Sequence, residues 1–324
     1  MAGVSAATVS RAVNGSGPVS IETRAIIDRV INESGFRPNS IGRQLKTART
    51  HTIGVLVPSL KNPIFADAVN GIECAAKNKG YNVLLASSGY STERESSAVE
   101  TFLNSRVEGL VLTVTDEAKS PALTILSSAG IPFVLMFNPV KNSSYSTISI
   151  DNRKAAFELV CNILELGHRR IAMIAGRFSE SDRSVERQAG YQDALRHYGI
   201  DQVSITEVGF ENQDISEQIN ALHEAKNSPT AYFCSTDVIA IATIRALTQL
   251  GKNVPTDVSV VGFDGISLGE WLTPSLTTAV QPAEQMGEWA MKHLIERIDD
   301  DETVKNLVLP YHLRHGESLV APSI

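Results

Sequence analysis

The sequence predicts an α/β fold, with two doubly wound parallel-sheet domains behind a small all-α segment. From Thr52 onward, short runs rich in Val, Ile and Leu alternate with longer amphipathic stretches, a pattern typical of parallel strands joined by helical crossovers. The length of 324 residues also exceeds one ordinary core and suffices for two domains with a small appendage.

The predicted strands are short apolar runs that do not alternate with polar residues, as expected of strands buried on both faces. They cover residues 53–57, 81–86, 109–112, 133–137, 148–150, 171–175, 231–234 and 258–263. Predicted helices cover 65–79, 93–105, 152–165, 185–198 and 238–250. We place the division between the two domains near Asp151, because about four strand–helix units lie on each side of it.

The tail is predicted to add a helix at 284–298, and strands at 304–309 and 312–314, back to both domains. Parallel sheets bind ligands at the carboxyl ends of their strands. Two facing sheets therefore predict a small-molecule cleft between the domains.

Charge is distributed unevenly along the chain, whose net charge is −7. Residues 1–52 carry seven basic and three acidic side chains, whereas the remainder carries 22 basic and 33 acidic ones. A basic head on an acidic body predicts a polyanion-binding module. Cys74, Cys161 and Cys234 show no metal or redox spacing, and we expect reduced core thiols and neither metal nor cofactor.

The start of the chain has no basic segment followed by an apolar core, and no apolar run approaches the roughly 20 residues that span a bilayer. We therefore expect a cytoplasmic protein with no membrane partner.

The head is predicted to contain two helices. Residues 5–13 form the first, with Ser5 as its N-cap, and the second is capped by Ser20 and ends near Ser34. Apolar residues within 26–31 would form the core stripe of the second helix.

The motif Ala-Gly-Val-Ser-x-x-Thr-Val-Ser-Arg-x-Val-Asn at 2–14 resembles the turn and recognition helix of the LacI/GalR family, to which the lac repressor belongs. Gly-Phe-x-Pro-Asn at 35–39, followed by Ile41, Arg43 and Leu45, resembles that family's hinge helix. Body motifs follow in the family's order: Gly-Ile-Glu (71–73), Gly-Tyr (80–81), Asp-Asn (151–152), Gly-His-Arg (167–169), Arg-x-x-Gly-Tyr (187–191) and Val-Gly-Phe-Asp (261–264). The resemblance covers essentially the whole chain. It implies a periplasmic-binding-protein-like body and a helix-turn-helix head.

The resemblance places DNA contacts on the first helix. Ala6, Ala7 and Arg11 would read bases in the major groove, where arginine can donate two hydrogen bonds to guanine. Phosphate contacts are implied for Ser5, Thr8, Ser10 and Asn14. Alternatively, Ser5 is a plain helix cap and the alanines are helix-favouring filler.

The resemblance implies that the hinge at 39–46 adds Asn39, Leu45 and Lys46 to the DNA contacts. Leu45 would insert into the minor groove as an apolar wedge. Alternatively, Leu45 packs against its own domain. Gly42 replaces the alanine common in the family and costs roughly 1 kcal/mol of helix stability. We therefore expect a hinge that folds on binding DNA.

The family motif normally follows a complete helix, whereas this sequence begins at Met1. We expect a truncated helix-turn-helix that lacks its first helix and binds DNA poorly as written.

The sequence contains no phosphate loop, no nucleophile elbow and no His-Glu-x-x-His motif, so no catalytic residue and no enzyme activity are expected. The resemblance, together with residue chemistry, instead implies nine effector-binding residues: Phe65, Asp151, Arg183, Arg187, Phe210, Thr236, Asp237, Asp264 and Gln281. Their carboxylates and guanidinium groups can orient sugar hydroxyls or clamp an acid. The alternatives are helix caps for Asp237 and Asp264, a core position for Phe65 and a solvated loop charge for Arg183.

The predicted domains are a head at 1–37, a hinge and linker at 38–51, an N-terminal effector subdomain at 52–150 plus about 281–309, and a C-terminal one at 151–280 plus about 310–324. The implied function is transcriptional regulation, and we expect a homodimeric repressor on near-palindromic operator DNA, controlled by a sugar or sugar acid. Two alternatives stay open, a stand-alone solute-binding protein without DNA activity and a sugar-modifying enzyme.

Overall fold

The computed structural model describes residues 2–14, 17–34, 49–140, 144–210, 214–299 and 303–322, with Val13 and Asn14 as backbone only. The chain forms two compact units, Met1–Thr50 and His51–Ile324.

The first unit contains helices α1 (Ala6–Asn14) and α2 (Ile21–Ser34). Both predicted N-caps are confirmed, because Ser5 Oγ accepts from Thr8 N at 3.2 Å and Ser20 Oγ accepts from Thr23 N at 3.3 Å. Fewer apolar residues of α2 are buried than the sequence predicted for 26–31. Ile27 is buried, whereas Ile26 is exposed.

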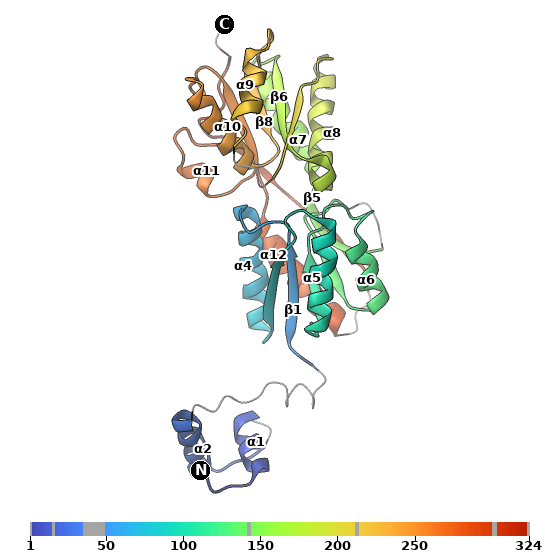
Figure 1. Cartoon of the computed structure of the whole chain (residues 1–324), viewed down its shortest axis with the longest axis vertical. Helices are drawn as coiled ribbons and strands as arrows, with labels where there is room; N and C mark the ends of the chain where they lie inside the picture. The colour runs from blue at the N-terminus through green and yellow to red at the C-terminus, as the bar shows by residue number, and fades with distance from the viewer. Residues whose placement is uncertain are drawn as a thin grey trace. The chain divides into compact units, whose positions relative to one another are not determined.

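The second unit contains two six-stranded sheets (Figure 1). The first has the order β11-β5-β4-β3-β1-β2, and all its pairings are parallel. Its strands are β1 (Thr52–Val57), β2 (Asn82–Ser87), β3 (Gly109–Leu112), β4 (Phe133–Met136), β5 (Ser146–Ile150) and β11 (Asn306–Leu309).

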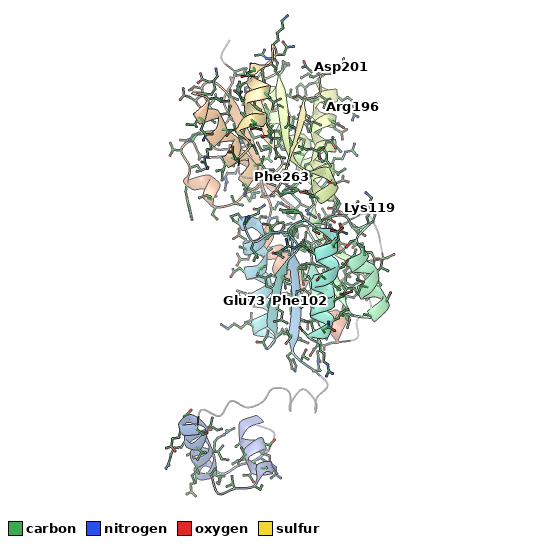
Figure 2. The ribbon with its side chains drawn as sticks, viewed as in Figure 1. Glu73, Phe102, Lys119, Arg196, Asp201 and Phe263 are labelled. Carbon is green, nitrogen blue, oxygen red and sulfur yellow. The ribbon has the colours of Figure 1, made fainter. Side chains whose placement is uncertain are left out.

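Helices cover both faces of this sheet. One apolar cluster lies under α4 (Pro63–Asn78) and α12 (Ala283–Ile298), and another under α5 (Thr92–Asn104) and α6 (Pro121–Ala129). Phe102 of α5 belongs to the second cluster (Figure 2). Helices α4 and α12 approach closely because each has a glycine at the contact, and a Cβ at Gly71 or Gly287 would collide with the backbone of the other helix. We call this sheet with its helices the first subdomain.

The second sheet has the order β12-β10-β9-β8-β6-β7 and is parallel except for β12, which pairs antiparallel with β10. Its strands are β6 (Ile171–Gly176), β7 (Ile205–Val208), β8 (Ala231–Cys234), β9 (Ser259–Asp264), β10 (Thr277–Val280) and β12 (His312–Arg314). Apolar clusters lie under α7 (Asn152–Glu165) and α8 (Asp182–His197) on one face, and under α9 (Ser216–Glu224) and α10 (Asp237–Gln249) on the other. Two short helices, η1 (Phe178–Glu180) and α11 (Leu268–Trp271), lie in loops of this second subdomain.

The chain passes between the subdomains three times, after β5, after β10 and after β11. The predicted class, two doubly wound parallel sheets, is confirmed. Strands β7 and β10 and helices α6 and α9 were not predicted.

Two expectations about burial are wrong. Strand β2 is not buried on both faces, since Leu84 and Leu85 are 40% and 43% exposed at the sheet edge, where none of the described strands lies beyond them. Cys74 is exposed on α4, whereas Cys161 and Cys234 are buried, and all three are free thiols. Among the described residues, no helix is long and apolar enough to cross a bilayer.

Candidate functional site

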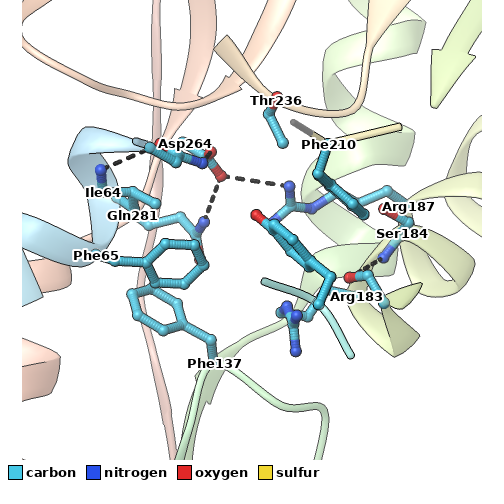
Figure 3. Close-up of a pocket in the computed structure, with 13 residues that line it drawn as sticks. Ile64, Phe65, Phe137, Arg183, Ser184, Arg187, Phe210, Thr236, Asp264 and Gln281 are labelled. Carbon is cyan, nitrogen blue, oxygen red and sulfur yellow. Dashed lines mark hydrogen bonds and ion pairs between the residues drawn. The ribbon is translucent and has the colours of Figure 1, made fainter. Parts of the chain in front are cut away.

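A pocket lies between the two subdomains, at the carboxyl ends of their parallel strands (Figure 3). Residues from both subdomains and from the segment after β10 line it: Asn62, Ile64, Phe65, Tyr90, Phe137, Ser181, Arg183, Ser184, Arg187, Phe210, Thr236, Asp264 and Gln281. This is where doubly wound sheets place their ligands.

Asp264, the last residue of β9, is the centre of the hydrogen-bond network in this pocket. Its Oδ1 accepts from Gln281 Nε2 at 2.9 Å and lies 3.3 Å from Arg187 Nη1, while its Oδ2 accepts from Asn62 Nδ2 at 3.0 Å. The carboxylate therefore joins the second subdomain, the crossover segment after β10 and the start of α4 in the first. Its φ of 121° is strained for a residue other than glycine, and such strain concentrates at functional sites.

Arg187 of α8 is buried with Asp264, and its position is fixed by several contacts. Its Nε donates to Asn152 Oδ1 at 2.9 Å, Nη1 donates to Ser235 O, and the guanidinium stacks 3.7 Å over the Phe263 ring. Burial lowers the pKa of Arg187 to about 10, which the Asp264 carboxylate partly offsets. The group remains a cation at neutral pH and holds Asp264 in place.

The start of α8 touches the first subdomain directly. Asp182 N donates to Thr115 O at 2.8 Å, and Asp182 Oδ2 accepts from Asn138 Nδ2 at 2.8 Å. Arg183 Nη1 donates to Val114 O at 2.8 Å and to Asp182 Oδ1 at 3.1 Å. Arg183 is therefore a buried contact across the cleft and not a solvated loop charge. Its buried Nη2 has no partner among the described residues.

Two aromatic pairs line the cleft. Phe65 and Phe137 of the first subdomain pack edge to face, with ring centroids 5.4 Å apart. Tyr90 of the first subdomain stacks on Phe210 of the second at 4.2 Å and an interplanar angle of 9°. Tyr90 follows β2 and Phe210 follows β7, the two edge strands. The stack therefore spans the cleft on the side away from the crossover segments.

The structure brings seven of the nine expected effector residues together in the pocket lining: Phe65, Arg183, Arg187, Phe210, Thr236, Asp264 and Gln281. Asp151 is exposed and caps α7, accepting from Lys154 N at 2.9 Å. Asp237 lies beneath the pocket, where its carboxylate accepts from Gly265 N and Ile266 N, both at 2.8 Å, and from the Thr278 hydroxyl at 2.6 Å.

Sequence reasoning did not select several other lining residues, namely Asn62, Ile64, Tyr90, Phe137, Ser181 and Ser184. The sequence could have pointed to Asn62, because an asparagine directly before Pro63 is typical of an N-cap at a helix start. No sequence pattern pointed to Tyr90, since its position depends on the left-handed φ of 60° that turns the chain after β2.

In the head, the residues expected to contact DNA lie along α1. Ser5, Ala6, Ala7, Ser10 and Arg11 are exposed, and Thr8 is half-buried. The side chain of Asn14 and all of Asn39, Leu45 and Lys46 lie outside the described residues.

Away from the cleft, a serine, a histidine and a glutamate lie in contact in the same succession as in a catalytic triad. Ser146 Oγ lies 2.9 Å from His293 Nε2, and His293 Nδ1 lies 3.1 Å from Glu296 Oε2. Ser146 is fully buried and also accepts from Lys305 N at 3.2 Å, so no substrate reaches its hydroxyl. The cluster ties β5 to α12. The described part of the chain holds no group of three or more His, Cys, Asp or Glu side chains suited to a metal ion.

Comparison with known families matches both units. Residues 1–39 match the model described as "Bacterial regulatory proteins, lacI family". Residues 50–315 match the model described as "Periplasmic binding proteins and sugar binding domain of LacI family".

Individual relatives match nearly end to end. The "HTH-type transcriptional repressor CytR" of Escherichia coli strain K12 is 34% identical over 299 residues, which cover 91% of this chain and 86% of that protein. The lac repressor dimer bound to operator and the anti-inducer ONPF has a TM-score of 0.84 at 26% identity, covering 99% of this chain and 97% of that one. The complex of the transcriptional regulator CelR with cellobiose has a TM-score of 0.74 at 31% identity, covering 98% and 97%.

Asp237 gives a prediction about pH. Burial, followed by the nearby Asp264 carboxylate, raises the pKa of Asp237 to about 7, whereas in the unfolded chain it titrates near 4. Between these two pKa values, Asp237 is protonated in the folded state and ionised in the unfolded state. The contribution of protonated Asp237 to the free energy of unfolding is therefore fully present below pH 4 and is lost as the pH rises to 7. We expect the free energy of unfolding of the wild type, relative to Asp237→Asn, to fall by up to roughly 1.4 kcal/mol per pH unit from pH 4.5 to 7.

The measurement is urea denaturation of both proteins across this range. Asp201→Asn, at an exposed carboxylate, is the control and should follow the wild type. Parallel profiles for the wild type and Asp237→Asn would contradict the prediction.

Proposed function

The chain belongs to the LacI family of bacterial regulatory proteins, and on that premise we propose that it represses transcription as a homodimer on near-palindromic operator DNA. A small molecule in the cleft between its two subdomains controls this binding. The observation that carries the proposal is the pairing of a LacI-type helix-turn-helix with a two-subdomain body whose cleft is lined by polar groups from both sides.

Exposed residues of α1 support the DNA-binding role. Ala6, Ala7 and Arg11 would meet base edges, and small side chains near the helix start permit close approach to the major groove. Ser5, Thr8, Ser10 and Asn14 would contact phosphates, and the hinge would add Asn39, Leu45 and Lys46. The relative solved on operator is a dimer, and one recognition helix per half-site explains how a two-fold dimer reads a near-palindrome.

The cleft supports a sugar or sugar acid as the effector. Asp264, Asn62 and Gln281 can fix the directions of hydroxyl groups, while Phe65 and Phe210 offer apolar faces for a ring. The unpartnered Nη2 of Arg183 can donate to a ligand oxygen. One solved relative holds cellobiose, which agrees with this class of ligand.

The remaining parts of the proposal concern organisation and location. We assign the head to residues 1–37, the hinge to 38–51 and the two effector subdomains to 52–150 with 281–309 and 151–280 with 310–324. The protein acts in the cytoplasm, where its operator lies, and it catalyses no reaction. Support for the last point is that its relatives are regulators and that the Ser146 cluster is closed to substrate.

Because we expect weak DNA binding by the chain as written, base reading by Arg11 is tested at low salt, where affinity is highest, with an operator selected from random duplexes. Arg11→Ala should weaken binding to that operator by about 30-fold or more, because a bidentate contact to guanine is worth roughly 1–3 kcal/mol and the dimer loses one such contact in each half-site. It should also relax the preference at one base pair in each half-site. Fluorescence anisotropy on the operator and on single-base variants measures both effects.

Arg29→Ala, at an exposed cation of α2, is the matched control. It should weaken binding to all duplexes about equally. The same uniform loss for Arg11→Ala would show that Arg11 contacts only the backbone.

Effector binding is testable by thermal shift with ribose, cellobiose and gluconate. A ligand at 100 times its Kd should raise the Tm by about 5–10 °C. Asp264→Ala and Arg187→Ala should abolish the shift, whereas Lys119→Ala, at an exposed cation outside the pocket, should leave it intact. A shift that survives in both cleft variants would place the ligand elsewhere.

A further inference from the structure

A second hollow lies at the opposite end of the second sheet from the cleft. It has a volume of about 300 Å³ and is lined by the loops that lead into β6, β7 and β8, by the first residue of β6 and by Leu222 near the end of α9. The lining residues are Arg169, Arg170, Ile171, Gln202, Ser204, Leu222, Ala225, Lys226, Asn227 and Pro229. Because the cleft lies at the carboxyl ends of the strands and this hollow at their amino ends, the length of the six-residue strand β6, roughly 20 Å, separates them.

Every charged residue in this lining is a cation. Arg169, Arg170 and Lys226 are exposed, and none of them pairs with an acid among the described residues. The nearest acids along the chain, Glu165, Asp201 and Glu224, do not line the hollow. Glu165 accepts from the Tyr198 hydroxyl at 3.4 Å, and Glu224 accepts from Asn220 Nδ2 at 3.0 Å. Three unpaired cations around one hollow stand out on a protein whose net charge is −7 and create a local positive potential.

Backbone carbonyls hold both guanidinium groups in place. Arg169 Nη1 donates to Leu164 O and His168 O, both at 2.8 Å, and Arg170 Nε donates to Ser228 O at 2.9 Å. The remaining N–H groups of the two side chains have no partner within the part of the chain that the structure describes. A fixed guanidinium loses less entropy on binding an anion than a free one does.

The other polar lining groups add hydrogen-bond donors from the remaining loops. Gln202 and Ser204 come from the loop before β7, and Asn227 from the loop before β8. Arginine and lysine only donate hydrogen bonds, so the set suits a ligand whose oxygens only accept them. Phosphoryl groups have this property, and the volume admits a compact molecule with one or two of them.

We propose that this hollow is a second small-molecule site, which binds a phosphorylated metabolite or inorganic polyphosphate through Arg169, Arg170 and Lys226. It is separate from the effector cleft and needs neither DNA nor effector to be occupied.

Pyrophosphate is the probe, and isothermal titration at 150 mM KCl with the full chain measures its binding. We expect saturable binding of one pyrophosphate per chain. Arg170→Gln and Lys226→Gln should each raise the Kd about fivefold or more. Lys226 is exposed and makes no side-chain hydrogen bond to another described residue, so its variant stays informative if the arginine variant unfolds. Arg196→Gln, at an exposed cation paired with Asp193, is the control and should leave the Kd unchanged.

Glucose 6-phosphate is titrated in parallel. A lower Kd for glucose 6-phosphate than for pyrophosphate favours a phosphorylated metabolite as the ligand, and a higher Kd favours inorganic polyphosphate. No saturable pyrophosphate binding by the wild type, or equal affinity in the wild type and Lys226→Gln, overturns the proposal. Loss of binding in Asp264→Asn together with retention in Lys226→Gln also overturns it, because the probe would then occupy the cleft. None of these results bears on operator binding, so they leave the proposed function standing.

Discussion

The buried ion pair between Asp264 and Arg187 is the interaction on which the rest of the cleft depends. Burying two charges costs free energy unless each is paired and hydrogen-bonded, and here both conditions are met. Arg187 is held by Asn152, the Ser235 carbonyl and the Phe263 ring, and Asp264 by Gln281 and Asn62. Since Asn62 belongs to the other subdomain, its hydrogen bond to Asp264 requires the cleft to be closed.

This requirement explains how a ligand could act at a distance. A ligand that takes over the hydrogen bonds of Asp264 and Asn62 replaces the direct contact between the subdomains with a bridge through itself. The contacts of Asp182 and Arg183 with the first subdomain, and the Tyr90–Phe210 stack, would then adjust with the cleft. The three crossover segments confine such adjustment to a hinge motion of one subdomain against the other.

Strands that are apolar along their whole length could be predicted from the sequence. Strands that are partly exposed, or that contain polar residues, could not. Strands such as β3 and β6 are apolar throughout because helices cover both faces. Strand β7 was missed because it is a half-exposed edge strand, and β10 because two of its four residues are threonines. In the site, most expected residues line the cleft, but Asp151 caps α7 and the Asp237 carboxylate accepts from the amides of Gly265 and Ile266. The place of Asp151 directly before a predicted helix is an N-cap signal, whereas the contact of Asp237 with a loop far along the chain leaves no local pattern. Tyr90 reaches the cleft through a left-handed turn, which a sequence does not display.

The most direct test is the linkage between cleft and operator. Operator affinity would be measured by anisotropy at increasing concentrations of a ligand that shifts the Tm, for the wild type and for Asp264→Asn. The account predicts that saturating ligand changes the operator Kd of the wild type by about fivefold or more, and that Asp264→Asn reduces or abolishes this change. An operator Kd of the wild type that stays constant while the cleft fills would contradict it.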